Sequence, residues 1–258
     1  MDINRLRTIR LDLSFSELSS YHIMMEKFLH NELLKIEAHY EEIEKQKVEG
    51  GESEQHKEMY LDSVGEDYQM VKSYHAHSFR ASFLVHLFSM LEYHLKVHCD
   101  FVADHIKSAY RMSDLREESD IMRAKKFLEK SFKIDWSKLS PEWTSLLHLK
   151  TIRNNIVHFN GRAQKNEKVW KSLAALPPGW YEIREGKFDD VDSRGRTKYE
   201  PDHYYSYVIT SSSLNEHFLH NIKSFLTKIV MQKAISKNPK ATNKKFMKFT
   251  PVDEEKTN

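Results

Sequence analysis

The segment LHLKTIRNNIVHFNG, residues 147–161, places an arginine, two asparagines and a histidine within six positions of a predicted helix. A guanidinium group is permanently charged and holds a phosphate through forked N–H donors. A histidine side chain ordinarily titrates near neutral pH, so it can take or give a proton there. Arg153 is therefore a candidate phosphate clamp and His158 a candidate general base or acid. Asn154 is a candidate for orienting the imidazole or holding a phosphate oxygen.

Helical spacing predicts which side of this helix carries these side chains. At 100° per residue, Asn154 lies about 100° and His158 about 140° from Arg153. The expected core stripe, formed by Leu149, Ile152, Ile156 and Phe159, lies on roughly the opposite side. Asn154 and His158 are four residues apart, so their side chains are neighbours on the expected outer face.

Two large apolar residues fall on the same outer face. Trp143 and Leu147 project there together with Asn154 and His158. An apolar outer stripe is unusual for a solvated helix face and favours a second packed surface. We therefore expect a homodimer that forms through helix 141–160.

The same polar residues also have a purely structural interpretation. Arginine, asparagine and histidine near a helix C-terminus complement the helix dipole and cap its last carbonyl groups. Spacing alone does not choose between capping and catalysis.

Glu92 is a further candidate on a second helix. It lies in SMLEYHL, within a stretch that is apolar on most sides, and it shares a narrow polar strip with Ser89 and Lys96. A carboxylate on a buried helix needs a partner. Arg153 or His158 can be that partner in a site, and Lys96 can be it in a structural i, i+4 ion pair.

The composition limits the function classes. Seven glycines and six prolines in 258 residues favour long helices over a turn-rich β fold, and a net charge of +2 does not indicate a strongly basic nucleic-acid-binding protein. The single cysteine excludes an intrachain disulfide framework and fits a reducing cytoplasm. The N-terminal residues lack the apolar core of a secretory signal, and the most apolar run, 82–95, contains two histidines and a glutamate, so we expect no membrane span.

Hydrophobic periodicity predicts an all-α fold. The expected helices are 16–48, 55–108 with a possible break at Gly65, 116–132, 141–159 and 213–234. WYEIR and YYSYVIT predict a short β-hairpin at about 180–209, before the last helix. We expect a helical extension over 1–70, a helical bundle over 71–235 and a basic disordered tail over 236–258.

The order of motifs resembles the HEPN family. Residues 153–158 match its signature of an arginine, a spacer of four to six residues and a histidine, with the frequent asparagine after the arginine. An earlier helix carrying Ser89 and Glu92, the helix IMRAKKFLEK, an EW…L…L lead-in and a glycine after the histidine fit the family's context. The resemblance covers roughly residues 79–234.

The resemblance implies a compact helical bundle, often a dimer in which two signature helices face each other. It implies a metal-independent endoribonuclease in a toxin or anti-phage defence role, leaving 2′,3′-cyclic phosphate and 5′-hydroxyl ends. Its expected partners are RNA, a second copy and an antitoxin or defence-system protein. The family's tyrosine that a partner nucleotidyltransferase modifies is replaced here by Asn160, which argues against inhibition by that route.

An alternative is an inactive helical module that binds a protein partner or a nucleotide through the same helix. No cofactor is expected, because the chain lacks a glycine-rich phosphate loop. No metal is expected either, because the histidine pairs, such as His94 with His98, lack the companions of a zinc or di-iron site. Cys99 is interpreted as a packing residue.

Overall fold

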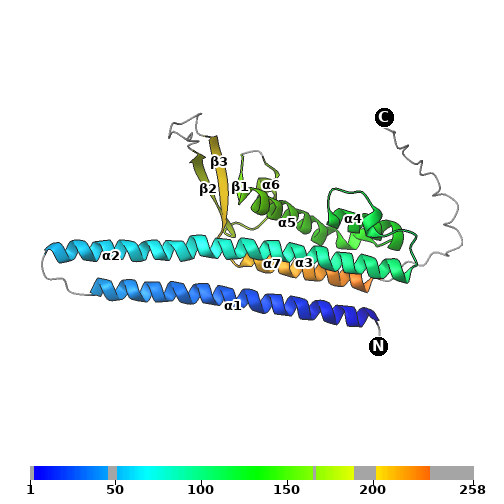
Figure 1. The fold of residues 1–258 in the computed structure, drawn as a ribbon, viewed down its shortest axis with the longest axis horizontal. Coiled ribbons are helices and arrows are strands. Elements are labelled where there is room, and N and C mark those ends of the chain that lie inside the picture. The colour runs from blue at the N-terminus through cyan, green and yellow to red at the C-terminus, as the bar shows by residue number, and fades with distance from the viewer. Residues whose placement is uncertain (1–2, 46–50, 165–166, 189–201, 233–258) are drawn as a thin grey trace, which may run out of the picture.

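The computed structural model describes residues 3–45, 51–164, 167–188 and 202–232. Its most prominent feature is a long antiparallel helical hairpin (Figure 1). One arm is α1 (Ile3–Lys45); the other runs through α2 (Gly51–Gln69), a π-helical segment (Met70–His75) and α3 (Ala76–His105). The long N-terminal helix is confirmed, although it starts earlier than predicted. Gly65 lies inside α2, so the possible break does not occur there, and the π-helical segment begins at residue 70.

The remaining helices pack along one end of this hairpin. They are α4 (Asp120–Phe127), α5 (Ser140–Phe159), α6 (Lys168–Ala174) and α7 (Ser213–Met231), with a π-helical turn (Leu128–Phe132) and 3-10 turns (Met112–Asp114 and Trp136–Leu139) between them. Helix α7 contacts α1, α3 and α5, and α3 also contacts α4 and α5. The fold class is mostly α, as predicted.

A small antiparallel sheet sits at the C-terminal end of α5 (Figure 1). Its strands are β1 (Arg162–Ala163), β2 (Tyr181–Phe188) and β3 (Asp202–Ile209), in the order β1-β3-β2. The register pairs Tyr181 with Ile209 and Phe188 with Asp202, so the predicted hairpin is confirmed. Strand β1 and helix α6 were not predicted.

One hydrophobic core joins these elements. The expected inner faces of two helices are fully buried: Ile121, Ala124, Phe127 and Leu128 around α4, and Leu214, Phe218, Ile222, Phe225, Leu226 and Ile229 in α7. Helix α3 contributes Leu84, Leu87, Leu91 and Cys99, all without exposed surface. Burial raises the pKa of the Cys99 thiol to about 12, which fits the packing role expected for this residue.

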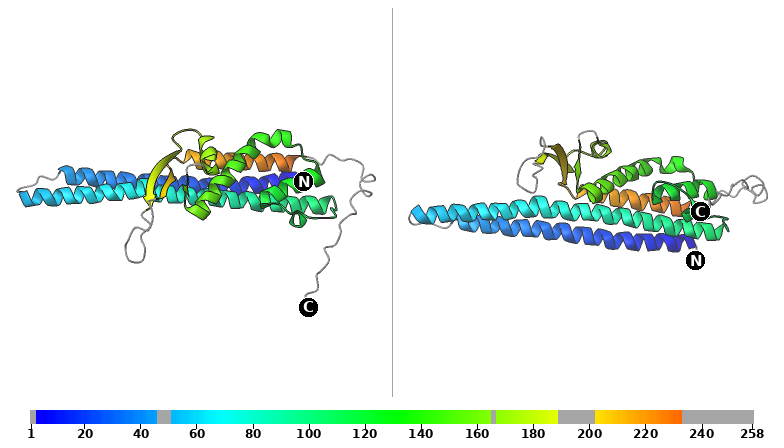
Figure 2. Two further views of the ribbon diagram at one scale, coloured as in Figure 1. Left: turned by 90° about the horizontal axis from the view of Figure 1, so that it is seen from above. Right: turned by 45° about the horizontal axis from the view of Figure 1, so that its top comes forward.

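The N-terminal part of α1 belongs to the same core. Leu11, Phe15 and Leu18 pack in it, whereas the far end of the α1–α2 hairpin runs past the sheet, away from the other helices (Figure 2). The predicted division at residue 70 stays a prediction. The predicted tail, 236–258, lies outside the described residues. Within the described ranges, no helix combines the length and apolarity needed to cross a bilayer.

Candidate functional site

Helix α5 carries three of the four predicted site residues, and its ends are defined by local sequence. Pro141 lies in its first turn, where a missing N–H costs nothing. Ser140 is the first helical residue, and no side-chain hydrogen bond caps this end. At the other end Asn160 and Gly161 adopt positive φ angles of 50° and 75°, which turn the chain into β1. Gly161 accepts a hydrogen bond of 3.2 Å from the Tyr207 amide.

The buried faces of α5 differ partly from the prediction. Leu149 and Ile152 are fully buried, as expected, and Ile156 packs half-buried against the core. Phe159, expected in the core, is 59% exposed, because the last turn of α5 lies at the edge of the bundle.

The expected outer apolar stripe is wrong at Trp143. Its side chain is 8% exposed, and its ring centroid lies 5.2 Å from that of Trp136 and 5.8 Å from that of Phe225. Leu147 is half-buried and also packs against the core. Other elements pack against the first half of α5 on more than one side, whereas the prediction assumed a single buried face. Trp143 and Leu147 therefore do not form an exposed surface.

Arg153 is held in a defined position on α5. Its Nη1 atom donates a hydrogen bond of 3.1 Å to Oδ1 of Asn154. Its guanidinium carbon lies 5.5 Å from the centroid of the Phe88 ring on α3, within cation–π distance. In the described part of the chain Arg153 makes no ion pair within 4.0 Å, and its buried Nε has no hydrogen-bond partner. No carboxylate of the described chain therefore pairs with the charge of the guanidinium within 4.0 Å.

His158 lies on the exposed last turn of α5. Its ring contacts Phe159 edge-on, with 6.3 Å between ring centroids. Asn154 binds Arg153 through its Oδ1 atom. Of the two roles predicted for Asn154, the structure therefore shows neither directly, and the residue instead fixes the guanidinium.

Glu92 is half-buried on α3 and faces several charges. Burial raises the pKa of its carboxyl group, and the positive charge of Arg153 is the largest influence in the opposite direction, ahead of Lys150 and Arg123. Asp120 raises the pKa further. Glu92 is thus placed near the α5 arginine, although the described residues include no ion pair of Glu92 within 4.0 Å.

The other two residues of the expected polar strip on α3 lie at the protein surface. Ser89 and Lys96 are exposed, and the Ser89 hydroxyl donates to the Val85 carbonyl at 3.0 Å. Among the described residues Lys96 forms no ion pair with Glu92, so the structure favours Arg153 over Lys96 as its electrostatic partner.

Two further basic residues that the sequence pattern did not indicate act on Glu92. Lys150 on α5 pairs with Glu118 at 2.6 Å, and Arg123 on α4 pairs with Asp120. Lys150 precedes Arg153 by three residues, so helical spacing could have found it. Arg123 offers no such signal, because only the packing of α4 against α3 brings it near.

In the described ranges no three His, Cys, Asp or Glu side chains gather where they could hold a metal ion. Comparisons with family models, with curated proteins and with solved structures gave no match. The HEPN resemblance therefore rests on the residues of this chain alone.

Proposed function

We propose that the protein is a metal-independent endoribonuclease that acts at the exposed end of α5. The observation that most directly supports the proposal is how Arg153 is held and which partners it lacks. Its guanidinium is fixed by Asn154 and Phe88, has no carboxylate paired with it in the described chain, and shares a helix with the exposed His158. A positioned cation and an accessible imidazole on one helix supply two groups that cleavage of RNA through its own 2′-hydroxyl requires, a charge that stabilises the phosphorane and a proton acceptor.

In the proposed reaction His158 takes the proton from the ribose 2′-hydroxyl, whose oxygen attacks the adjacent phosphorus. Arg153 stabilises the negative charge of the phosphorane through its forked donors. The P–O5′ bond then breaks, and the departing oxygen receives a proton. A second copy of the chain supplies this proton through its own His158. The products are a 2′,3′-cyclic phosphate and a 5′-hydroxyl. Glu92 acts as a positioning residue, because its charge attracts Arg153 from the facing helix.

The proposed dimer needs a surface other than the one first expected. Val157 and Phe159 are 47% and 59% exposed and flank His158 on the last turn of α5. A two-fold contact through these residues would bring two copies of His158 close together. Phe159→Asp should shift the sedimentation profile from dimer to monomer. Leu34→Asp, at an apolar position 48% exposed on the far part of α1, is the control and should leave the profile unchanged.

The exposed Val157 and Phe159 equally favour the second candidate, an inactive helical module that binds a protein through this end of α5. A toxin or anti-phage role, with an antitoxin or defence-system partner in a cytoplasmic setting, follows from the HEPN resemblance and is part of the proposal.

The deciding experiment is cleavage of a mixed RNA pool in EDTA by wild type, His158→Ala, Arg153→Gln and His39→Ala. His39 is an exposed histidine on α1 and serves as the matched control. We expect cyclic-phosphate ends from wild type and His39→Ala only. Equal cleavage by a folded His158→Ala protein would refute the assignment. No cleavage by wild type at high protein concentration would favour the binding module.

A further inference from the structure

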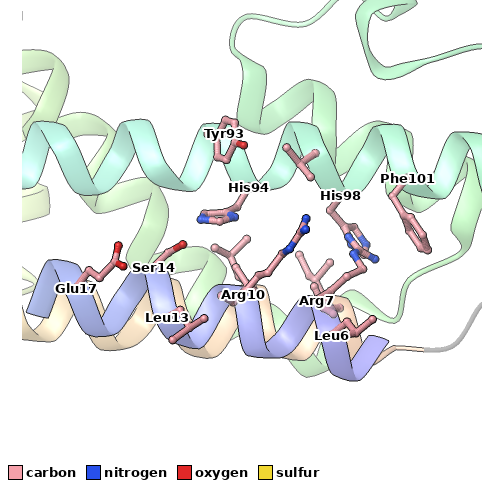
Figure 3. Close-up of a pocket in the computed structure, with 15 residues that line it drawn as sticks. Leu6, Arg7, Arg10, Leu13, Ser14, Glu17, Tyr93, His94, His98 and Phe101 are labelled. Atoms are coloured by element: carbon pink, nitrogen blue, oxygen red, sulfur yellow. The ribbon is translucent and has the colours of Figure 1, made fainter. Parts of the chain in front are cut away.

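A cavity of about 650 Å³ opens between the N-terminal part of α1, α3 and the last turns of α7 (Figure 3). No residue of α5 lines it, so it is separate from the proposed nuclease site. Apolar side chains form much of its wall, among them Leu6, Leu11, Val97, Phe101, Leu226 and Ile229. Its volume is within the range of sites that bind small molecules, roughly 300–1,000 Å³.

Arg7 reaches into this cavity from α1. Its guanidinium carbon lies 4.0 Å from the centroid of the Phe101 ring, and Nη2 lies 2.6 Å from Nδ1 of His98. Burial lowers the pKa of Arg7. Arg7 has no ion pair within 4.0 Å in the described residues. A charged group in partly apolar surroundings without a counter-ion is unfavourable, and a bound anion would offset this cost.

His98 fixes Arg7 without neutralising it. The His98 side chain is 3% exposed on α3. Because a guanidinium only donates, Nδ1 must accept the hydrogen bond, and the imidazole is neutral with its proton on Nε2. Nε2 is buried and has no hydrogen-bond partner in the described chain. The pair thus presents a positioned positive charge supported by a neutral ring.

Arg10 supplies a second positive charge one turn further along α1. Figure 3 shows its side chain crossing the cavity toward α3, between His94 and His98. Glu17 is the carboxylate among the lining residues, and it lies at the far end of the cavity from Arg7. Neither arginine forms an ion pair with Glu17 within 4.0 Å in the described structure. One end of the cavity is therefore cationic, and its walls are apolar.

We propose that this cavity binds a small amphiphilic anion. A carboxylate or phosphate head would bind Arg7 and Arg10, and an apolar chain or ring would lie against Val97, Phe101 and Leu226. This site does not depend on the proposed nuclease activity.

The test uses two fluorescent probes that differ by one anionic group. The probe 8-anilinonaphthalene-1-sulfonate carries a sulfonate, and N-phenyl-1-naphthylamine has the same rings without it. Both are titrated into wild type, Arg7→Met, Arg10→Gln and Arg5→Gln. Arg5 is an exposed arginine of α1 outside the cavity and is the matched control.

We expect Arg7→Met and Arg10→Gln each to weaken sulfonate binding about tenfold, the scale of one charge-assisted contact, and to leave the neutral probe unaffected. Arg5→Gln should behave as wild type. Val97→Trp, at a position 44% exposed, should obstruct the cavity and weaken both probes. Displacement by decanoate, decyl phosphate or inorganic phosphate then distinguishes a carboxylate, a phospholipid-like head and a free phosphate as the natural ligand chemistry.

Equal sulfonate affinity in wild type and in a folded Arg10→Gln protein would overturn the proposal. Because Arg10 is exposed and forms no ion pair within 4.0 Å in the described structure, we expect Arg10→Gln to fold, and this variant tests the proposal even if Arg7→Met unfolds. Equal weakening of both probes by Arg10→Gln would also contradict it, because the loss would then not concern charge.

Discussion

Asn155 donates a hydrogen bond of 2.8 Å from Nδ2 to the backbone carbonyl of Arg162, and so fastens the last turns of α5 to strand β1. The Asn155 side chain is 5% exposed. Its neighbour Asn154 instead accepts a hydrogen bond from Arg153. Two adjacent asparagines therefore have different tasks, one in holding the helix end and one in holding the guanidinium.

Asn155→Ala should lower the free energy of unfolding by about 0.5–1.5 kcal/mol, because it removes a buried hydrogen bond between the side chain and the backbone. Urea denaturation followed by circular dichroism measures the change. Asn154→Ala is the matched control and should change stability less while weakening RNA cleavage more. Equal stability losses in the two variants would show that the two amides are not divided in this way.

Trp143→Ala should destabilise the protein by about 3–5 kcal/mol, because it empties the space between Trp136 and Phe225. Phe159→Ala, at the exposed end of the same helix, should cost much less. Thermal unfolding of both variants decides between a core and a surface position for Trp143. A monomeric, fully stable Trp143→Ala protein would restore the interface first expected from the sequence.

Glu92→Gln should increase the free energy of unfolding at pH 7.5 relative to wild type, because burial outweighs the attraction of Arg153, as the raised pKa of Glu92 indicates. A carboxyl whose pKa is raised by folding binds more protons in the folded state, so its contribution to stability falls as the pH rises through that pKa. The gain in Glu92→Gln should therefore shrink as the pH is lowered toward 4.5. Urea midpoints at several pH values measure it, and Lys96→Gln should show no such trend.

The same variant tests the positioning role of Glu92. If its charge orients Arg153, Glu92→Gln should slow RNA cleavage and leave RNA affinity nearly unchanged. Unchanged cleavage kinetics would reduce Glu92 to a structural residue.

His98 should make the fold sensitive to acid. Burial, and then the charge of Arg7, lowers its pKa from 6.5 to about 3. The unfolded chain binds the proton more readily, so the stabilisation is complete above pH 6.5 and is lost as the pH falls from there toward 3. Between pH 7.5 and 5 this group alone should cost on the order of 2 kcal/mol.

Melting temperatures across this pH range measure the effect. His98→Asn keeps an acceptor for Arg7 without a titrating ring, so its melting temperature should fall less on acidification. His86→Asn, an exposed histidine of the same helix, is the control. A pH dependence identical in all three proteins would assign the acid sensitivity to other groups.

Hydrophobic periodicity predicted correctly those helices that bury the same face along their whole length. The inner faces of α4 and α7 follow one helical stripe each, because each packs a single face on the core. Strand β1 has only two residues, so no period exists to detect. Its place is set by pairing with β3 in the register Arg162 with Ser206.

Helix α5 shows why the candidate site was only partly predictable. A single core stripe correctly predicted that Leu149 and Ile152 are buried. It wrongly predicted an exposed Trp143 and a buried Phe159, because the neighbours of α5 change from one end of the helix to the other. The signature residues were found from their types and spacing. The electrostatic link between Glu92 and Arg153 joins two helices, and the Arg7–His98 contact joins residues 91 positions apart. Neither of these two interactions can be predicted from local sequence.

The labelling rate of Cys99 can measure local opening of the helical bundle. Cys99 is the single thiol of the chain, it has no exposed surface, and its raised pKa keeps it protonated at neutral pH. A thiol reagent can therefore modify the native protein only when α3 separates from its neighbours. The labelling rate reports how often the bundle opens, without any added probe, and a ligand that closes the nearby α1–α3 cavity should slow it.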